Sequence, residues 1–250
     1  MHDENRKTTQ GFWDSVHEAK PRARLPSLLV VTTRDLQRLL SAEVRPGMEV
    51  LEIGFAPGKQ LAYLAAKRGV RVAGLDYSQT GVNHARELFS ALGLEGDFRC
   101  EDAFQTSFEH ARFDVVYSVG VIEHFEDPRE FVRLHVELAR PGGTALILIP
   151  DYGGIYGKLQ RHFDADNLAI HNLKIMNPES LEELAPRDLA NDVRVFRCGR
   201  INPWQVSWHK RMPRPLALLT SFALNAAGVL QPFDVGPLCP MLALRIVRKG

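Results

Sequence analysis

The sequence predicts an α/β fold in which helices cover both faces of a mostly parallel β-sheet. Up to about residue 150, short apolar runs rich in β-forming residues alternate with longer segments of helical periodicity. A glycine-containing segment follows the first of these runs, where open α/β sheets commonly bind a ligand. The 250 residues are 45% hydrophobic, which is enough to build the core that such a sheet needs.

Five segments before residue 150 are predicted to be strands, because each is short, apolar and rich in β-forming residues. They span residues 49–53, 70–75, 96–100, 113–118 and 144–149. Helices are predicted between them at 58–68, 79–92 and 128–139, where apolar residues recur with helical spacing. This alternation predicts right-handed βαβ units and therefore parallel strands.

The remaining segments are predicted to complete a single domain, residues 1–250. Residues 1–44 are expected to form a helical cover before the core at 45–150. Residues 151–176 are too long and too rich in Tyr, His and Gly for an ordinary connection, which is typical of a lid or binding loop. In the C-terminal part, 177–250, we expect a helix to about residue 185, strands at 192–198 and 241–247, and an apolar helix at 214–228.

The charge and the cysteine content exclude several classes of function. Lys and Arg total 31 against 30 Asp and Glu, so the net charge of +1 gives no general attraction for nucleic acid, and no nucleic-acid partner is expected. Cys100, Cys198 and Cys239 lie far apart, which indicates neither a disulfide framework nor a zinc site of usual spacing. A reducing, cytoplasmic location fits this pattern best.

Membrane insertion is not expected from the sequence. The first ten residues lack the apolar run of a secretory signal. The apolar stretch 215–230 is shorter than the roughly 20 residues needed to span a bilayer. It could pack in the core, contact a membrane surface or form the face of a homodimer, and the sequence leaves these alternatives open.

The segment after the first predicted strand carries the strongest functional signal. Its spacing, Glu52-x-Gly54-x-Ala56-x-Gly58, allows a tight turn at Gly54 and a helix that starts close to a ligand. It differs from the GxGxxG of dinucleotide sites, and the acidic residue beside the loop disfavours phosphate and suits a cationic ligand. Asp76 closes the second strand, where a carboxylate can accept hydrogen bonds from both hydroxyls of a ribose.

These motifs resemble those of class I S-adenosylmethionine-dependent methyltransferases, in the small-molecule group that includes the ubiquinone-biosynthesis O-methyltransferases. The resemblance covers about residues 44–150 and includes the turn Arg140-Pro141-Gly142-Gly143. It implies a Rossmann-like, seven-stranded and mostly parallel sheet with a reversed last strand, and S-adenosyl-L-methionine as the cofactor. Ala56 departs from the family's middle glycine, which puts the backbone path of the loop in question.

The resemblance also implies which residues hold the cofactor. The loop would hold its methionine part, Asp76 would bind the ribose, the segment after the third strand would meet the adenine, and the end of the fourth strand would face the transferred methyl. The residues so implied are Glu52, Gly54, Phe55, Ala56, Gly58, Asp76, Tyr77, Ser78, Asp102, Ala103, Ser118 and Val119.

His124 is the candidate catalytic base, because it directly follows the fourth strand near the expected methyl path. The alternative is that it only caps and packs the following helix. In some quinone O-methyltransferases the similar segment ExxEH binds a divalent cation. Here Glu123 and His124 match its second half, but Gly120 stands at the first glutamate position, so no required metal is expected.

Residues 151–176 are expected to form the acceptor lid. Tyr152, Tyr156, His162 and His171 could line a pocket for a small molecule, and each could equally pack the lid onto the sheet. The predicted function is methyl transfer to O or N of a small-molecule metabolite. The alternatives are a non-catalytic binding or scaffold protein of the same fold, or a protein methyltransferase.

Overall fold

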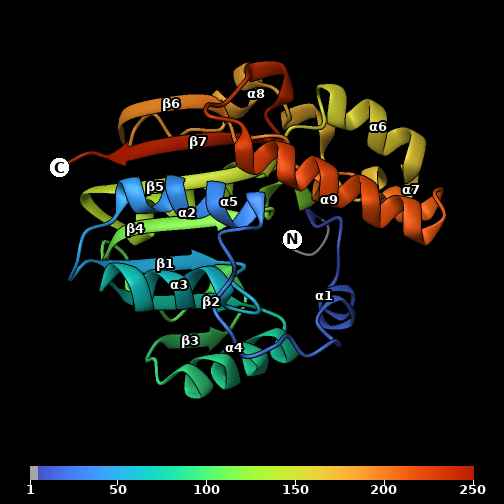
Figure 1. Cartoon of the computed structure of the whole chain (residues 1–250). Helices are drawn as coiled ribbons and strands as arrows, with labels where there is room; N and C mark the ends of the chain where they lie inside the picture. Colours follow the sequence, from blue (N-terminus) through green and yellow to red (C-terminus); the bar gives the residue numbers. More distant parts are fainter. Residues whose placement is uncertain (1–4) are drawn as a thin grey trace.

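A seven-stranded sheet forms the centre of the computed structural model, which describes residues 5–250 (Figure 1). Its strand order is β3-β2-β1-β4-β5-β7-β6, and only β7 runs antiparallel to its neighbours β5 and β6. The strands are β1 (Glu49–Ile53), β2 (Arg71–Asp76), β3 (Asp97–Cys100), β4 (Phe113–Val119), β5 (Ala139–Pro150), β6 (Ala190–Cys198) and β7 (Met241–Arg248). The expected mostly parallel sheet with a reversed last strand is confirmed.

Helices pack on both faces of the sheet and bury two apolar clusters. One cluster holds side chains of α2 (Val31–Glu43), α3 (Lys59–Arg68) and α4 (Gln79–Leu92). The other holds side chains of α5 (Arg129–Leu138) and α8 (Pro178–Glu182). Neighbouring residues of β1, such as Val50 and Leu51, enter opposite clusters, as the alternation of side chains along a strand requires.

The structure differs from the sequence prediction in two segments. The fifth strand begins earlier, because Phe113 pairs with Ala139 and Val115 with Thr144, so residues 140–143 bulge out within one strand. Residues 151–176, where the sequence predicts a lid or binding loop, contain the helices α6 (Ile155–Phe163) and α7 (Ala165–Ala169). The other helices are α1 (Gln10–Val16) and α9 (Arg214–Leu230).

Within residues 5–250, no helix combines the length and the apolar character that crossing a membrane requires. The three cysteines are free, and Cys198 and Cys239 are buried.

A buried ion pair joins the N-terminal helices to the C-terminal part of the chain. The Arg200 guanidinium donates to the Asp35 carboxylate of α2, and the Arg200 backbone N–H donates to the same carboxylate at 2.7 Å. The two side chains are only 6% and 8% exposed. Removing one member of such a pair leaves a charge in a low-dielectric interior without its partner.

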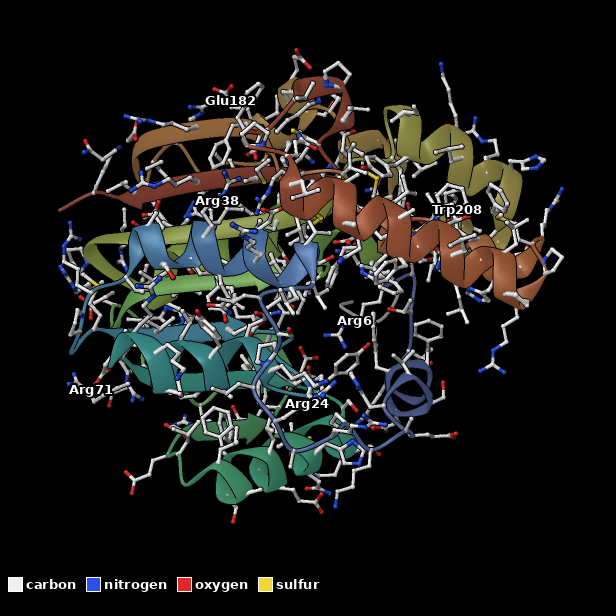
Figure 2. All side chains as sticks on the ribbon, in the orientation of Figure 1. Arg6, Arg24, Arg38, Arg71, Glu182 and Trp208 are labelled. Carbon is white, nitrogen blue, oxygen red and sulfur yellow. The ribbon has the colours of Figure 1, made fainter. Side chains whose placement is uncertain are left out.

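We therefore expect Arg200→Met to lower the free energy of unfolding by about 3 to 5 kcal/mol, measured by chemical denaturation. The matched control is Arg38→Met, since Arg38 of α2 pairs with Asp234 but is 45% exposed (Figure 2). That control should cost at most about 1 kcal/mol. Equal losses in the two variants would contradict a special role for the buried pair.

Candidate functional site

A pocket lies where strands β1, β2, β3 and β4 end. Its lining comes from the ends of these strands and the loops that follow them, from Phe131 of α5, and from the N-terminal segment around α1. The lining residues are Arg6, Thr8, Trp13, His17, Ile53, Gly54, Ala56, Leu75, Asp76, Tyr77, Glu101, Ala103, Val119, Gly120, Val121, His124, Phe125 and Phe131. The carboxyl edge of an open α/β sheet is where such folds bind ligands.

The turn after β1 requires glycine. Gly54 has φ of +75°, and a Cβ there would lie 2.6 Å from Cγ2 of Val121. Its backbone N–H donates to the Leu75 carbonyl at 2.7 Å, which ties the turn to the end of β2. Gly58, the N-cap of α3, has φ of +81° and approaches Ala85 of α4. The turn therefore brings the backbone close to the pocket.

Ala56 fits this turn because Gly81 of α4 makes room for it. A Cβ on Gly81 would lie 2.4 Å from the Cβ of Ala56. Ala56 lines the pocket, and its backbone N–H donates to Asp76. The departure from the family's middle glycine is thus matched by a glycine on the facing helix.

Asp76 is the central acid of the pocket. It ends β2, is 9% exposed, and accepts hydrogen bonds from the backbone N–H groups of Ala56 at 3.1 Å and Ser78 at 2.9 Å. Burial raises the pKa of Asp76 above its ordinary value, and these backbone N–H groups oppose the rise. These two hydrogen bonds go to different carboxylate oxygens, and each oxygen can accept more than one, so acceptor capacity remains for a ligand with hydroxyl groups.

The N-terminal helix α1 is held over this pocket by Asp14. Its carboxylate accepts from the Ser78 hydroxyl at 2.7 Å and from the Thr80 backbone N–H at 3.2 Å. Ser78 itself is fully buried and caps α4 by accepting from Gly81. Trp13 and His17 of this segment line the pocket, whereas Phe12 does not.

Several residues expected to touch the cofactor lie behind the pocket instead. Glu52 is 4% exposed and accepts a hydrogen bond from the Tyr117 hydroxyl at 2.8 Å, because its side chain points into the interior of the sheet. Burial raises the pKa of Glu52 to about 8, so it supplies no charge to a ligand at neutral pH. Phe55, Gly58, Ser78 and Ser118 also lie outside the lining and support it from behind.

Asp102 and Ala103 were both expected to touch the cofactor, but they do not both line the pocket. Asp102 does not line the main pocket, since it pairs with the Arg6 guanidinium at 2.6 Å and accepts from the Phe104 backbone N–H at 3.1 Å. Glu101 and Ala103 do line it. Although burial opposes ionisation of Glu101, hydrogen bonds from Ser107 lower its pKa, so an anion faces this end of the pocket.

His124 lines the pocket and is held in one tautomer. Its Nδ1 lies 2.9 Å from the Ile170 carbonyl, which can only accept, so Nδ1 carries the proton and the Nε2 lone pair is free. Burial lowers the pKa of His124 to about 4, so the ring is neutral at neutral pH. Its ring lies edge to face with Trp13 at 5.1 Å and 4.9 Å from the ring of His171.

His171 completes a group that sequence spacing did not reveal. Glu123, His124 and His171 offer ligand atoms that lie within 4.8 Å of one another, so they could hold a metal ion. Burial raises the pKa of Glu123 to about 8, and its Oε2 is buried without a hydrogen-bond partner. At neutral pH all three side chains are therefore uncharged in the absence of a cation.

The residues expected to line an acceptor lid do not line the main pocket. The Tyr156 hydroxyl donates to the Leu238 carbonyl and accepts from the Asn202 backbone N–H, and the Tyr152 hydroxyl donates to the Gln205 carbonyl. His162 is exposed on α6 and packs beside Phe163. Of the four expected residues, His171 contacts the pocket-lining His124, and the Tyr152 ring lies edge to face with His171 at 5.4 Å.

A second, largely apolar cavity adjoins the first. The two share Val119 and Gly120 at the end of β4. The other lining residues of the second cavity are Thr32, Asp35, Leu36, Leu39, Pro150, Cys198, Gly199, Asn202, Gln205, Pro240 and Met241. Sequence reasoning did not identify Arg6, Thr8 and His17 of the first cavity, nor the residues just named in the second. All of them come from segments whose sequence carries no recognisable motif.

Comparison with known proteins gives one family and one fold. Residues 51–147 match a methyltransferase-domain family. The chain is 33% identical over 102 residues to the chloroplastic tocopherol O-methyltransferase of Arabidopsis thaliana, which is 40% of this chain and 29% of that protein. It is 22% identical over 203 residues to a ubiquinone biosynthesis O-methyltransferase of Coxiella burnetii, covering 81% of this chain and 78% of that one.

Among solved structures, phosphoethanolamine N-methyltransferase 2 of Haemonchus contortus in complex with S-adenosyl-L-methionine superposes with a TM-score of 0.60 at 19% identity. The superposition covers 87% of this chain and 52% of that chain, and it shows a shared fold. The match to the tocopherol O-methyltransferase spans less than a third of that protein's length.

The buried carboxyl of Glu52 predicts a loss of stability at alkaline pH. Its pKa is about 8 in the fold against 4.5 ordinarily, so the folded state holds a proton that the unfolded state has released. The stability gained from this proton is fully present below the pKa of the unfolded state and is lost as the pH rises through the pKa of the folded state. We therefore expect Glu52 to lower the free energy of unfolding by about 2 kcal/mol between about pH 6 and about pH 8.

Glu52→Gln should remove this part of the pH dependence, as measured by chemical denaturation at both pH values. The control is Glu18→Gln, whose carboxylate is exposed and should leave the dependence unchanged. A Glu52→Gln protein that loses stability with pH as steeply as the wild type would contradict a protonated Glu52.

Proposed function

We propose that this chain is a class I S-adenosylmethionine-dependent methyltransferase that transfers a methyl group to O or N of a small-molecule acceptor, since residues 51–147 match a methyltransferase-domain family and the fold is shared with a solved methyltransferase. Asp76 carries the proposal: a buried carboxylate with unused acceptor capacity lies beside a glycine turn at the carboxyl edge of the sheet. A ribose offers the two hydroxyl donors that this carboxylate can accept.

The pocket suits the rest of the cofactor as well. Gly54 and Ala56 bring backbone close to where the methionine part would lie, Tyr77 and Ala103 flank the region for the nucleoside, and Val119 and Gly120 border the region for the methyl group. When bound, S-adenosyl-L-methionine supplies an electrophilic methyl group on a sulfonium centre. The carboxylates of Asp76 and Glu101 favour a cation in this mostly apolar pocket, because the Arg6 guanidinium that also lines it is paired with Asp102.

Methyl transfer asks little of the side chains beyond position and exclusion of water. Trp13 and Thr8 close the pocket from the N-terminal side, since the Trp13 indole N–H donates to the Thr8 hydroxyl at 3.0 Å. We propose that His124 accepts the proton of the attacking hydroxyl or amine through its free Nε2. We propose a reaction without a required metal, because Gly120 stands where the first glutamate of the similar metal-binding segment would lie.

The acceptor is proposed to enter through the second cavity. That cavity meets the cofactor pocket at Val119 and Gly120, where the methyl group would lie, and apolar side chains such as Leu36, Leu39 and Met241 line much of it. We assign structural roles in the lid to Tyr152 and Tyr156, because their hydroxyls already bind backbone carbonyls. The same role is proposed for His162. An acceptor with an apolar portion beside its nucleophile fits this arrangement best.

The direct test of the proposed function is turnover. The purified protein, treated with EDTA, is incubated with methyl-labelled S-adenosyl-L-methionine and a metabolite extract, and labelled products are identified by mass spectrometry. We expect a labelled small molecule. Cofactor binding without any labelled small molecule or protein would instead support a binding or scaffold role, and turnover restored only by a divalent cation would contradict the metal-free reaction.

Asp76→Asn should weaken binding of S-adenosylhomocysteine by about tenfold to hundredfold, measured by isothermal titration calorimetry. The change removes the charge that the ribose hydroxyls would meet and keeps the size of the side chain. Asp97→Asn is the control, because Asp97 begins β3 with a half-exposed side chain outside the pocket. An unchanged affinity in Asp76→Asn would place the ribose elsewhere.

His124→Ala should lower the turnover number by about 100-fold and raise the Michaelis constant much less, once an acceptor is known. Burial keeps the pKa of His124 at about 4, so the ratio of wild-type to variant turnover should stay constant between about pH 6 and about pH 8. A variant with the wild-type turnover number would assign His124 to packing against Trp13 and His171 alone.

A further inference from the structure

Helix α9 presents its apolar side chains outward. The side chains that it buries are small: Ala217, Ser221 and Gly228. The side chains that it exposes are large and apolar, namely Leu216, Leu218, Leu219, Phe222 and Leu230, with exposed fractions between 48% and 81%. A helix that covers a core normally shows the reverse distribution.

The orientation of α9 is fixed by its inner face. A Cβ on Gly228 would lie 2.2 Å from the Ile201 carbonyl oxygen, so no larger residue fits there. The Asn225 amide oxygen accepts from the Val31 backbone N–H at 3.0 Å, and its NH₂ group donates to the Leu29 carbonyl at 2.9 Å. Rotating the helix to bury its leucines would break these bonds, so the apolar face is built to point outward.

The charges at one end of α9 are all positive. Lys210, Arg211 and Arg214 precede or begin the helix, each is exposed, and none forms an ion pair within residues 5–250. Residues 210–231 contain no Asp or Glu. The apolar face therefore adjoins a local excess of positive charge, although the whole chain carries only +1.

From this inverted helix and its cations we propose that α9 docks the protein on the surface of an anionic lipid bilayer. The helix lies along the outside of the molecule, where it can lie flat in the interfacial plane (Figure 1). The leucines and Phe222 would enter the acyl boundary while Lys210, Arg211 and Arg214 meet lipid phosphates. A second copy of the chain would offer this stretch the same cations and no acids, so charge complementarity favours the bilayer.

The second cavity lies beside α9. Asn202 of the cavity precedes η5 (Pro203–Gln205), which packs on α9, and Thr32 of the cavity belongs to α2, which also contacts α9. The side chain of Trp204 in η5 is exposed, as is Leu29 before α2. Docking would thus bring this cavity close to lipid. The docking itself does not depend on the proposed methyl transfer.

The test is flotation of the full chain with vesicles of phosphatidylcholine alone and of phosphatidylcholine mixed with phosphatidylglycerol. We expect binding to the mixed vesicles that weakens as salt is raised. The double variant Leu219→Ser with Phe222→Ser should bind at least about tenfold more weakly. Arg211→Gln with Arg214→Gln should lose about tenfold in affinity and most of the salt dependence.

Matched controls are Val16→Ser, an exposed apolar residue of α1, and Arg71→Gln, an exposed arginine at the opposite end of the molecule (Figure 2). Both should bind like the wild type. Circular dichroism and calorimetric titration with S-adenosylhomocysteine, without vesicles, check that each variant is folded, so a failure of docking is distinct from a failure of the proposed reaction.

Two results would overturn the proposal. One is a wild-type protein that floats with neither kind of vesicle. The other is a dimer in light scattering that Leu219→Ser with Phe222→Ser converts to a monomer while vesicle binding is absent, because α9 would then be the interface with a second copy.

Discussion

The carboxylate of Asp76 is the interaction on which the architecture of the site depends. It accepts hydrogen bonds from backbone N–H groups in the loop after β1 and at the start of α4, so it fixes two segments that are separate in sequence. A carboxylate with so little exposure is tolerated only when donors compensate for its lost hydration. The same acid that organises the loops therefore also presents an anionic acceptor to the pocket.

The cover over the pocket follows from this arrangement. Ser78, positioned by its N–H bond to Asp76, donates its hydroxyl to Asp14 of α1. The N-terminal segment, which carries the Arg6 labelled in Figure 2, thereby reaches the site. There Arg6 pairs with Asp102, and Trp13 contacts His124. Exclusion of water is, together with positioning, what a methyl transfer needs from the protein, so the cover belongs to the proposed chemistry as much as the glycine turn does.

Sequence periodicity predicted the sheet well because the βαβ units bury local, regularly spaced apolar residues. The positions of Gly54 and Asp76 also followed from sequence, since each sits at the end of a predicted strand. The position of Glu52 did not, because the resemblance assigns it to the loop whereas alternation along β1 directs it toward Tyr117 in the interior. The pairing of His124 with His171 was equally hidden, because 46 residues separate them and only tertiary packing brings them together.

A crystal structure of the protein with S-adenosylhomocysteine tests the central claim most directly. The account predicts that both ribose hydroxyls lie within hydrogen-bond distance of the Asp76 carboxylate, with the Ala56 and Ser78 backbone bonds retained. A bound cofactor whose ribose lies away from Asp76, or a carboxylate that turns from the loop to a different partner, would contradict it.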